Sequence, residues 1–251
     1  MFQPYPVMED SIMLIGQKIV VVGGTSGIGL AVARKAADCG AEVYVGSSSA
    51  EKLTSVLSSL QGIRGAVVDV GNEESVSHFF SSLSEIDHIV STVGETYRPT
   101  AFTETRLEEA QALYKIKYWG QFLVAKHGAP KLQENGSITF TSGILSARPV
   151  AGMGVLASIN AGVEALGKTL AVELAPRRVN TVCPGFIDTG KLWKDLPGEE
   201  REAKLQAKAT SDLLTARAGI PDDAAKSYLY GIYNPYVTGQ TIVVDGGGSL
   251  T

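Results

Sequence analysis

Cysteine and histidine are scarce in this sequence of 251 residues, and their positions exclude several kinds of site. The two cysteines, Cys39 and Cys183, lie far apart and form no CxxC pair, which argues against a disulfide scaffold and favours a reducing compartment. The three histidines, His78, His88 and His127, have no metal-ligand spacing with one another or with cysteine. We therefore expect no metal site.

An excess of basic charge and long apolar runs are also missing. The formal net charge is −4, which gives no electrostatic reason to expect nucleic acid or an anionic membrane as a partner. No apolar run approaches the length of a membrane span. Residues 1–15 contain acids, prolines and no basic start, so they do not resemble a signal peptide. We expect a cytoplasmic protein in which these residues form a short tail.

What the chain does contain is β-branched runs that alternate with helical segments. Strands are predicted at 18–22, 41–46, 65–70, 87–94, 136–143, 178–183 and 240–247. Helices are predicted at 29–40, 72–83 with Asn72 as N-cap, 106–131, 152–174 and 196–214. Apolar strands that alternate with helices predict a single α/β domain over 16–251, a doubly wound parallel sheet of Rossmann type with about seven strands and helices on both faces. A substrate-side excursion is expected at about 190–217.

The segment "VVVGGTSGIG" places glycines directly after the first strand and at the start of the first helix. Gly23, Gly27 and Gly29 allow a tight turn, close approach of a pyrophosphate to the backbone, and close packing of helix on strand. The helix N-terminus then offers oriented N–H groups to the phosphates. Thr25, Ser26 and Ile28 lie in the same turn, so the whole segment is predicted to bind a dinucleotide.

The G-x-x-x-G-x-G spacing resembles the cofactor turn of the short-chain dehydrogenase/reductase family. The resemblance continues through "VVDV", "STVG", "PGFIDTG" and "YVTGQTIVVDGG", and so spans roughly residues 16 to 248. It implies cofactor contacts at Asp69 and Val70 beside the adenine, at Val93 and Gly94 after the fourth strand, and at Pro184, Gly185, Ile187 and Thr189 on the nicotinamide side.

The end of the second strand indicates which nicotinamide cofactor is bound. NAD-preferring relatives place an acid there to bind the ribose hydroxyls. Here Ser47, Ser48 and Ser49 occupy the turn, and the first acid is Glu51. Three hydroxyls can donate hydrogen bonds to a 2′-phosphate, whereas an acid would repel it. NADP(H) is therefore favoured over NAD(H).

The catalytic side chains of the family, Asn, Ser, Tyr and Lys, are all changed. When "VLASINAGVEAL" is aligned on the family's Y-x-x-x-K-A-A-V-E-x-L pattern, Leu156 falls on the tyrosine and Asn160 on the lysine. Gly143 then falls on the serine and Lys117 on the asparagine. Because loss of one acid–base catalyst commonly costs on the order of 10²–10⁴ in rate, ordinary ketone reduction should be badly impaired. Asn160 retains the ability to hydrogen-bond the nicotinamide ribose.

Several side chains are candidates for the lost roles. Ser142, beside the lost serine, is the first candidate for a hydrogen-bond donor, and Lys117 is a candidate cation in the cavity. Leu156, Arg148 and Trp193 are predicted to contact the substrate, with Trp193 where the family covers its substrate.

Three functions remain open. The first is hydride transfer to a bulky organic substrate, such as a secondary metabolite, through a pre-activated electrophile; an iminium becomes a neutral amine without a proton. The second is a non-redox cyclase or isomerase in which the cofactor forms part of the pocket wall. The third is an inactive NADP(H)-binding sensor or scaffold. The resemblance further implies a homodimer or homotetramer that pairs the helices at 106–131 and 152–174.

Overall fold

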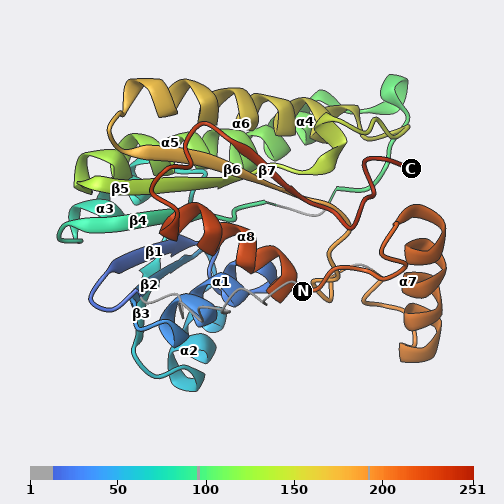
Figure 1. Ribbon diagram of the computed structural model, residues 1–251. Helices are drawn as coiled ribbons and strands as arrows, with labels where there is room; N and C mark the ends of the chain where they lie inside the picture. Colours follow the sequence, from blue (N-terminus) through green and yellow to red (C-terminus); the bar gives the residue numbers. More distant parts are fainter. Residues whose placement is uncertain (1–13, 95–96, 192) are drawn as a thin grey trace, which may run out of the picture.

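The computed structural model describes residues 14–94, 97–191 and 193–251, and it contains one parallel sheet (Figure 1). The seven strands lie in the order β3-β2-β1-β4-β5-β6-β7. They are β1 (Lys18–Val22), β2 (Glu42–Ser47), β3 (Ile63–Val67), β4 (Ile86–Ser91), β5 (Leu132–Thr141), β6 (Arg178–Pro184) and β7 (Thr241–Val244). The chain reverses its direction of travel across the sheet between β1 and β4, the place where such sheets bind ligands. The predicted fold class is confirmed.

Helices cover both faces of the sheet (Figure 1). They are α1 (Gly27–Asp38), α2 (Ala50–Ser59), α3 (Glu73–Ser81), α4 (Leu107–Tyr114), α5 (Gly120–Gly128), α6 (Gly154–Glu173), α7 (Gly198–Asp212) and α8 (Pro221–Tyr233). One core cluster joins the sheet to α3, α5 and α6 through Phe79, Val124 and Val163. A second joins it to α1 and α8 through Val32 and Tyr228. Because both faces are buried, the strands are apolar along most of their length.

Side-chain caps explain where several helices begin. The Asn72 side chain accepts a hydrogen bond from the amide of Ser75 at 3.2 Å, as predicted for an N-cap. Ser49 caps α2 in the same way through the amide of Lys52. At α8, Pro221 stands in the first turn and the Asp223 carboxylate accepts from the Ile220 amide.

Some element boundaries differ from the prediction. The segment predicted as one helix at 106–131 is divided by a π-helical turn, η2 (Lys115–Trp119), between α4 and α5. The third strand begins at Ile63 rather than 65, and no element was predicted where α8 lies. Residues 1–13 of the predicted tail lie outside the described residues. Leu14 is 1% exposed and its amide bonds the Cys39 carbonyl, so the folded domain begins before residue 16.

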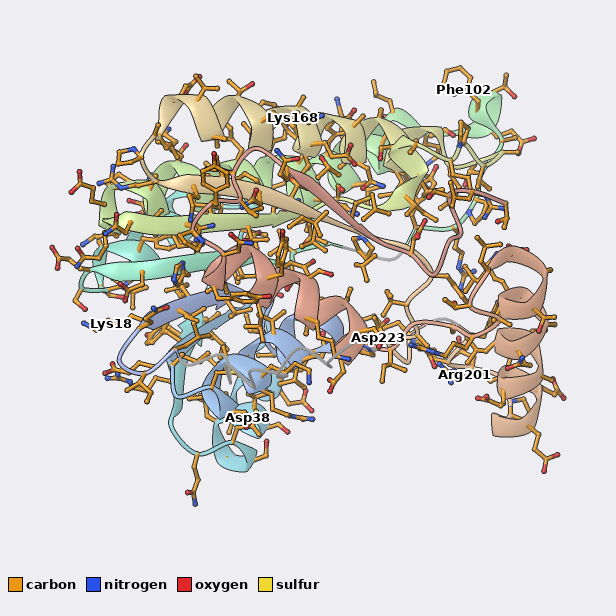
Figure 2. The ribbon with its side chains drawn as sticks, in the orientation of Figure 1. Lys18, Asp38, Phe102, Lys168, Arg201 and Asp223 are labelled. Atoms are coloured by element: carbon orange, nitrogen blue, oxygen red, sulfur yellow. The ribbon has the colours of Figure 1, made fainter. Side chains whose placement is uncertain are left out.

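By length and composition alone, α6 is apolar enough to cross a membrane, which the sequence analysis had not recognised. In the fold it packs along β5 and β6 instead, with Ile159 and Val163 fully buried. Lys168 lies on the face of α6 directed away from the sheet (Figure 2). The helix therefore packs one face on the sheet and leaves the other exposed, where Lys168, Thr169 and Glu173 accompany Ala161, Ala165 and Val172.

The predicted excursion is the segment that carries α7, which stands beside the main body (Figure 1). Two non-glycine residues with left-handed backbone angles bracket it, Trp193 with φ 53° and Ala216 with φ 51°. An ion pair between Asp188 and Arg201 ties α7 to the segment after β6.

A buried guanidinium holds the end of α8 against the sheet. Arg178, 8% exposed at the start of β6, donates to the carbonyl oxygens of Gly231 at 2.6 Å, Ile232 at 2.7 Å and Val237 at 3.0 Å. Burial lowers the pKa of this guanidinium. The three carbonyls at and after the helix C-terminus have their hydrogen bonds satisfied by one charged side chain.

Arg178→Met is therefore expected to lower the free energy of unfolding by about 3 kcal/mol, because it leaves buried carbonyls without a donor. Urea titration followed by circular dichroism measures the change. Arg64→Met is the control, since Arg64 is exposed and pairs only with Glu42; its loss should change stability by less than about 1 kcal/mol. Equal effects of the two substitutions would contradict the role of Arg178.

Candidate active site

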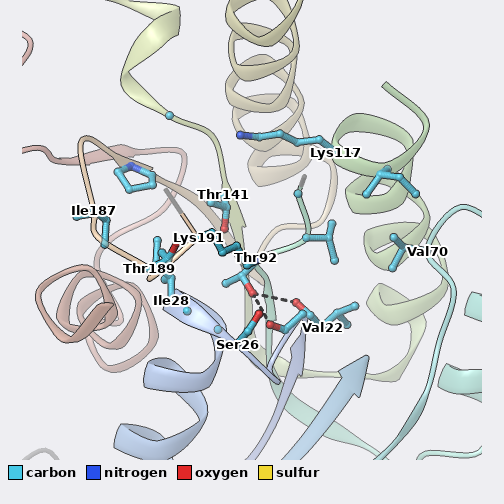
Figure 3. A pocket seen from close by; sticks show the side chains of 18 of the residues that line it. Val22, Ser26, Ile28, Val70, Thr92, Lys117, Thr141, Ile187, Thr189 and Lys191 are labelled. Carbon is cyan, nitrogen blue, oxygen red and sulfur yellow. Dashed lines mark hydrogen bonds between the residues drawn. The ribbon is translucent and has the colours of Figure 1, made fainter. Parts of the chain in front are cut away.

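A cavity of about 630 Å³ opens at the carboxyl ends of the strands (Figure 3). Every residue predicted to contact the cofactor lies in its wall. These are Gly23, Thr25, Ser26, Gly27, Ile28, Gly29, Ser47, Ser48, Ser49, Asp69, Val70, Val93, Gly94, Asn160, Pro184, Gly185, Ile187 and Thr189. The structure thus brings segments from across the sequence to one place, although their contacts with a cofactor stay a prediction.

The glycine turn has no room for side chains. A Cβ at Gly29 would lie 2.3 Å from the Gly23 carbonyl oxygen and 2.3 Å from Thr92 Oγ1. Gly23 and Gly27 have φ of 86° and 51°, in the left-handed region that favours glycine. The Ser26 side chain makes no cap hydrogen bond to α1. The turn therefore presents backbone to the cavity, as a phosphate group requires.

The serine loop after β2 is partly occupied by its own hydrogen bonds. The Ser47 hydroxyl lies 2.8 Å from Thr25 Oγ1 and also contacts the Ser49 backbone. Ser49 accepts from the Lys52 amide as the cap of α2, which leaves its O–H free to donate. Ser48 is exposed and has no hydrogen bond to a described residue. Two of the three predicted hydroxyl donors are therefore available, not three.

Lys52 is a residue of the cavity wall that the sequence analysis missed. It lines the cavity beside the serine loop, and its amine makes no ion pair with a described residue. The signal was present in "SSSAEK", because the first turn of the helix after β2 faces the same end of the cavity. A cation and two free hydroxyls at this end suit a phosphate rather than a bare ribose.

At the opposite end, two of the changed catalytic positions contact each other. The Asn160 side chain, 1% exposed, donates from Nδ2 to the Gly143 carbonyl oxygen at 3.1 Å. A Cβ at Gly143 would lie 2.9 Å from that same Nδ2 atom. Asn160 Oδ1 is buried and has no hydrogen-bond partner among the described residues. It fits the predicted role of accepting from a ribose hydroxyl, since buried polar atoms need partners.

Lys117 is held in the cavity wall by the π-helical turn. Its ammonium donates to the Ser142 carbonyl oxygen at 3.1 Å, and in Figure 3 its side chain extends across the cavity on the side away from Ser26. Gln121 fixes the turn: it donates to the Lys117 carbonyl at 2.8 Å and exchanges two hydrogen bonds with the Thr141 backbone. Burial lowers the pKa of Lys117 to about 8.

The other predicted catalytic and substrate residues are placed less favourably. Ser142 is 1% exposed and its hydroxyl faces the Val182 carbonyl at 3.5 Å, so the geometry counts against a donor role towards a substrate. Arg148 is absent from the described cavity wall and lies within electrostatic range of Asp212 at the end of α7. Trp193 is also absent from it, with its ring packed 6.3 Å from that of Phe186. Both were predicted to contact substrate, and that stays a prediction; Trp193 packs against Phe186, which itself lines the cavity.

The substrate half of the cavity is mainly apolar. Leu156 lies in the cavity wall, as predicted, with Ile144, Leu145 and Phe186. Tyr97, which the sequence analysis missed, adds a phenol whose hydroxyl is buried and has no hydrogen-bond partner among the described residues. The loop that carries it is tied to the start of α6 by a hydrogen bond from the Thr100 amide to the Gly152 carbonyl at 3.0 Å. No sequence pattern predicts the hydrogen bond between Thr100 and Gly152, because it joins two loops that are distant in the sequence.

Known proteins resemble this chain in sequence and in fold over nearly its whole length. The family model described as enoyl-(acyl carrier protein) reductase matches residues 22–249. Short-chain dehydrogenase/reductase ucsE from Acremonium sp. is 36% identical, over 92% of this chain and 95% of the relative. A crystal structure of a small-chain dehydrogenase in complex with NADPH is 36% identical with a TM-score of 0.81, over 94% of this chain and 100% of that one. The MalC reductase/Diels-Alderase structure from Malbranchea aurantiaca is 29% identical with a TM-score of 0.87, over 96% and 99%.

The unpartnered hydroxyl of Tyr97 yields a stability prediction. Tyr97→Phe should raise the free energy of unfolding of the ligand-free protein by about 1 kcal/mol, because a buried hydroxyl without a partner carries a desolvation cost. Thermal and urea unfolding measure the change.

Tyr228→Phe is the matched control. That tyrosine is fully buried, and its hydroxyl is bonded to Thr141 Oγ1 at 2.7 Å. Its loss should lower stability by about 1 kcal/mol. A destabilised Tyr97→Phe variant would show that the Tyr97 hydroxyl has a structural partner.

Proposed function

The chain belongs to the short-chain dehydrogenase/reductase family. We propose that it is an NADP(H)-dependent enzyme that transfers hydride to a bulky, mainly apolar secondary metabolite. The carbon that accepts the hydride is already activated in this substrate. The observation that carries the proposal is that Leu156 lies in the cavity wall. The sequence alignment predicts that it occupies the position of the family's tyrosine. A cavity that has the glycine turn for a nucleotide but no tyrosine to donate a proton suits an iminium substrate. An iminium that accepts hydride becomes a neutral amine and needs no proton.

The cofactor assignment rests on the two ends of the cavity. When bound, NADPH supplies the hydride. The glycine turn would bind its pyrophosphate, and Lys52 with Ser48 and Ser49 would bind its 2′-phosphate. Asn160 Oδ1 would accept from a ribose hydroxyl. The NADPH complex of a relative 36% identical supports the same preference for NADP(H) over NAD(H).

Lys117 favours a second candidate acceptor, a carbonyl. An ammonium in the cavity stabilises an oxygen that gains negative charge in the transition state and can donate the proton that Leu156 cannot. The same ammonium opposes a cationic iminium. The protonation state of Lys117 therefore distinguishes the two acceptors.

A non-redox cyclase is supported by a different observation. The apolar wall around Leu156 and Phe186 can hold a bulky substrate in a reactive shape, and rate can come from positioning alone. The MalC relative is described as both reductase and Diels-Alderase. Product formation without NADPH oxidation would select this function, and NADPH binding with no product would select an inactive sensor or scaffold.

The pH dependence of hydride transfer tests the acceptor. Two bicyclic compounds of similar shape serve as probes, α-tetralone and N-methyl-3,4-dihydroisoquinolinium, with NADPH oxidation as the readout. Above pH 8, where Lys117 loses its proton, kcat/KM for the iminium should rise by up to about tenfold as the like charge disappears. For the ketone it should fall about tenfold per pH unit.

Lys117→Met should remove the pH step for both probes. Lys126→Met is the matched control, because that lysine is on the neighbouring helix α5, exposed and paired with Glu73. A ketone turned over faster than the iminium at pH 7, with a fall above pH 8, would overturn the iminium assignment in favour of the carbonyl.

We also propose that the protein self-associates through α6. Four of its residues are buried, Ile159, Asn160, Val163 and Gly167, and small residues such as Ala161 and Ala165 are exposed on the outward face. Val172 is 79% exposed further along the helix. The small side chains on this face permit close packing of a second copy.

Ala165→Glu should reduce the mass of the assembly, because it places a charge in the proposed interface. Light scattering after gel filtration measures the mass. Ala50→Glu, at an exposed position of α2 on the other face of the sheet, is the control. A wild-type protein that is monomeric at about 50 μM would contradict self-association.

A further inference from the structure

The segment after β6 lies directly on the glycine turn. A Cβ at Gly27 would lie 3.2 Å from Thr189 Cγ2, so Thr189 packs over the start of α1. The Asp188 amide bonds the Gly219 carbonyl at 2.8 Å, which holds the segment from the other side. Figure 3 shows Thr189 and Lys191 beside each other, above Ser26 and Ile28. The glycine turn therefore has a second wall opposite the N-terminus of α1.

The one carboxylate in this segment is already neutralised. Asp188 Oδ1 accepts from the Gly190 amide at 2.9 Å and pairs with Arg201 on α7. Both side chains are mostly buried, with exposed fractions of 23% and 21%. Asp188 is therefore not available to Lys191. The Lys191 amine has no hydrogen bond or ion pair with any described residue.

The charges of the cavity wall are unevenly placed. Among the described residues, the wall contains three lysines, Lys52, Lys117 and Lys191, and one carboxylate, Asp69. Lys52 lies at the serine loop, and Lys117 is bonded to the Ser142 carbonyl at the far end. Among the described wall residues, Lys191 is thus the cation next to the glycine turn. Three cations and one anion among the described wall residues suit a polyanionic ligand.

We propose that Lys191 binds the pyrophosphate of the dinucleotide from the side opposite α1, so that the phosphates lie between backbone amides and an ammonium. This inference rests on the proposed binding of NADP(H). Lys191 belongs to the segment that Asp188 and Arg201 tie to α7, so the ion pair positions the lysine. Lys191 acts on a group that NADPH and NADH share, whereas Lys52 acts on the 2′-phosphate that NADH lacks.

Binding titrations separate the two lysines without any substrate. NADPH and NADH are titrated into the wild type, Lys191→Ala and Lys52→Ala, and nucleotide fluorescence and calorimetry give Kd. Lys191→Ala should weaken both nucleotides by the same factor, about fivefold to tenfold at low salt. Lys52→Ala should weaken NADPH by a similar factor and leave NADH unchanged. The loss from Lys191→Ala should shrink as salt rises.

Two further variants serve as controls for the role of Lys191. Lys194→Ala removes an exposed lysine of the same segment that is outside the described cavity wall, and it should leave both Kd values unchanged. Lys191→Arg keeps the charge and should restore most of the affinity.

Unchanged Kd values for Lys191→Ala would overturn the role of Lys191 alone, as would a loss confined to NADPH or an equal loss from Lys194→Ala. A wild-type protein that binds neither nucleotide would overturn the proposed function, and this inference with it.

Discussion

The contact between the glycine turn and the end of β4 is the constraint on which the rest of the site depends. Gly29 of α1 approaches the Gly23 carbonyl and Thr92 so closely that even a methyl group would collide. Thr92 Oγ1 in turn lies 3.2 Å from the carbonyl oxygens of both Val22 and Gly23. This packing sets α1 against β1 and β4 at the place where the strand order reverses, so the backbone amides of the turn face the cavity. The cofactor half of the site is therefore a consequence of backbone geometry.

The other half of the cavity depends on side chains, and there the residues predicted to replace the family pattern are connected by hydrogen bonds. Asn160 fills the space over Gly143 with its amide, and Gln121 holds the π-helical turn that directs Lys117 to the Ser142 carbonyl. Lys117 is buried and its pKa falls to about 8, close to the range in which an acid–base group works best at physiological pH. Leu156 cannot donate a proton. Among the residues of the described wall, Lys117 is a group with a pKa suited to that task.

The sequence predicted the fold, and also which segments meet around the glycine turn, because both follow from local rules. Glycines with left-handed φ, apolar strands and Asn72 as a cap each leave a pattern in neighbouring residues. The substrate half follows from contacts between distant loops, which a single sequence does not display. Tyr97 was missed because the Thr100–Gly152 hydrogen bond places its loop beside α6. Arg148 and Trp193 lie outside the described cavity wall, and the left-handed backbone conformation of Trp193 leaves no pattern in the sequence.

The replacement at the catalytic end is self-consistent, and this bears on how the site works. A serine at 143 would meet the Asn160 amide at 2.9 Å, so the family's serine cannot return while Asn160 keeps its place. A lysine at 160 would enter a wall in which Lys117 already carries a buried positive charge, and two ammonium groups in one desolvated cavity oppose each other. If the predicted alignment holds, restoring the family's side chains at 143 and 160 would also require changes in their neighbours. These positions depend on one another, so we interpret the site as a different arrangement beside the same glycine turn. In it, the shape of the cavity and the ammonium of Lys117 would take the place of the family's tyrosine.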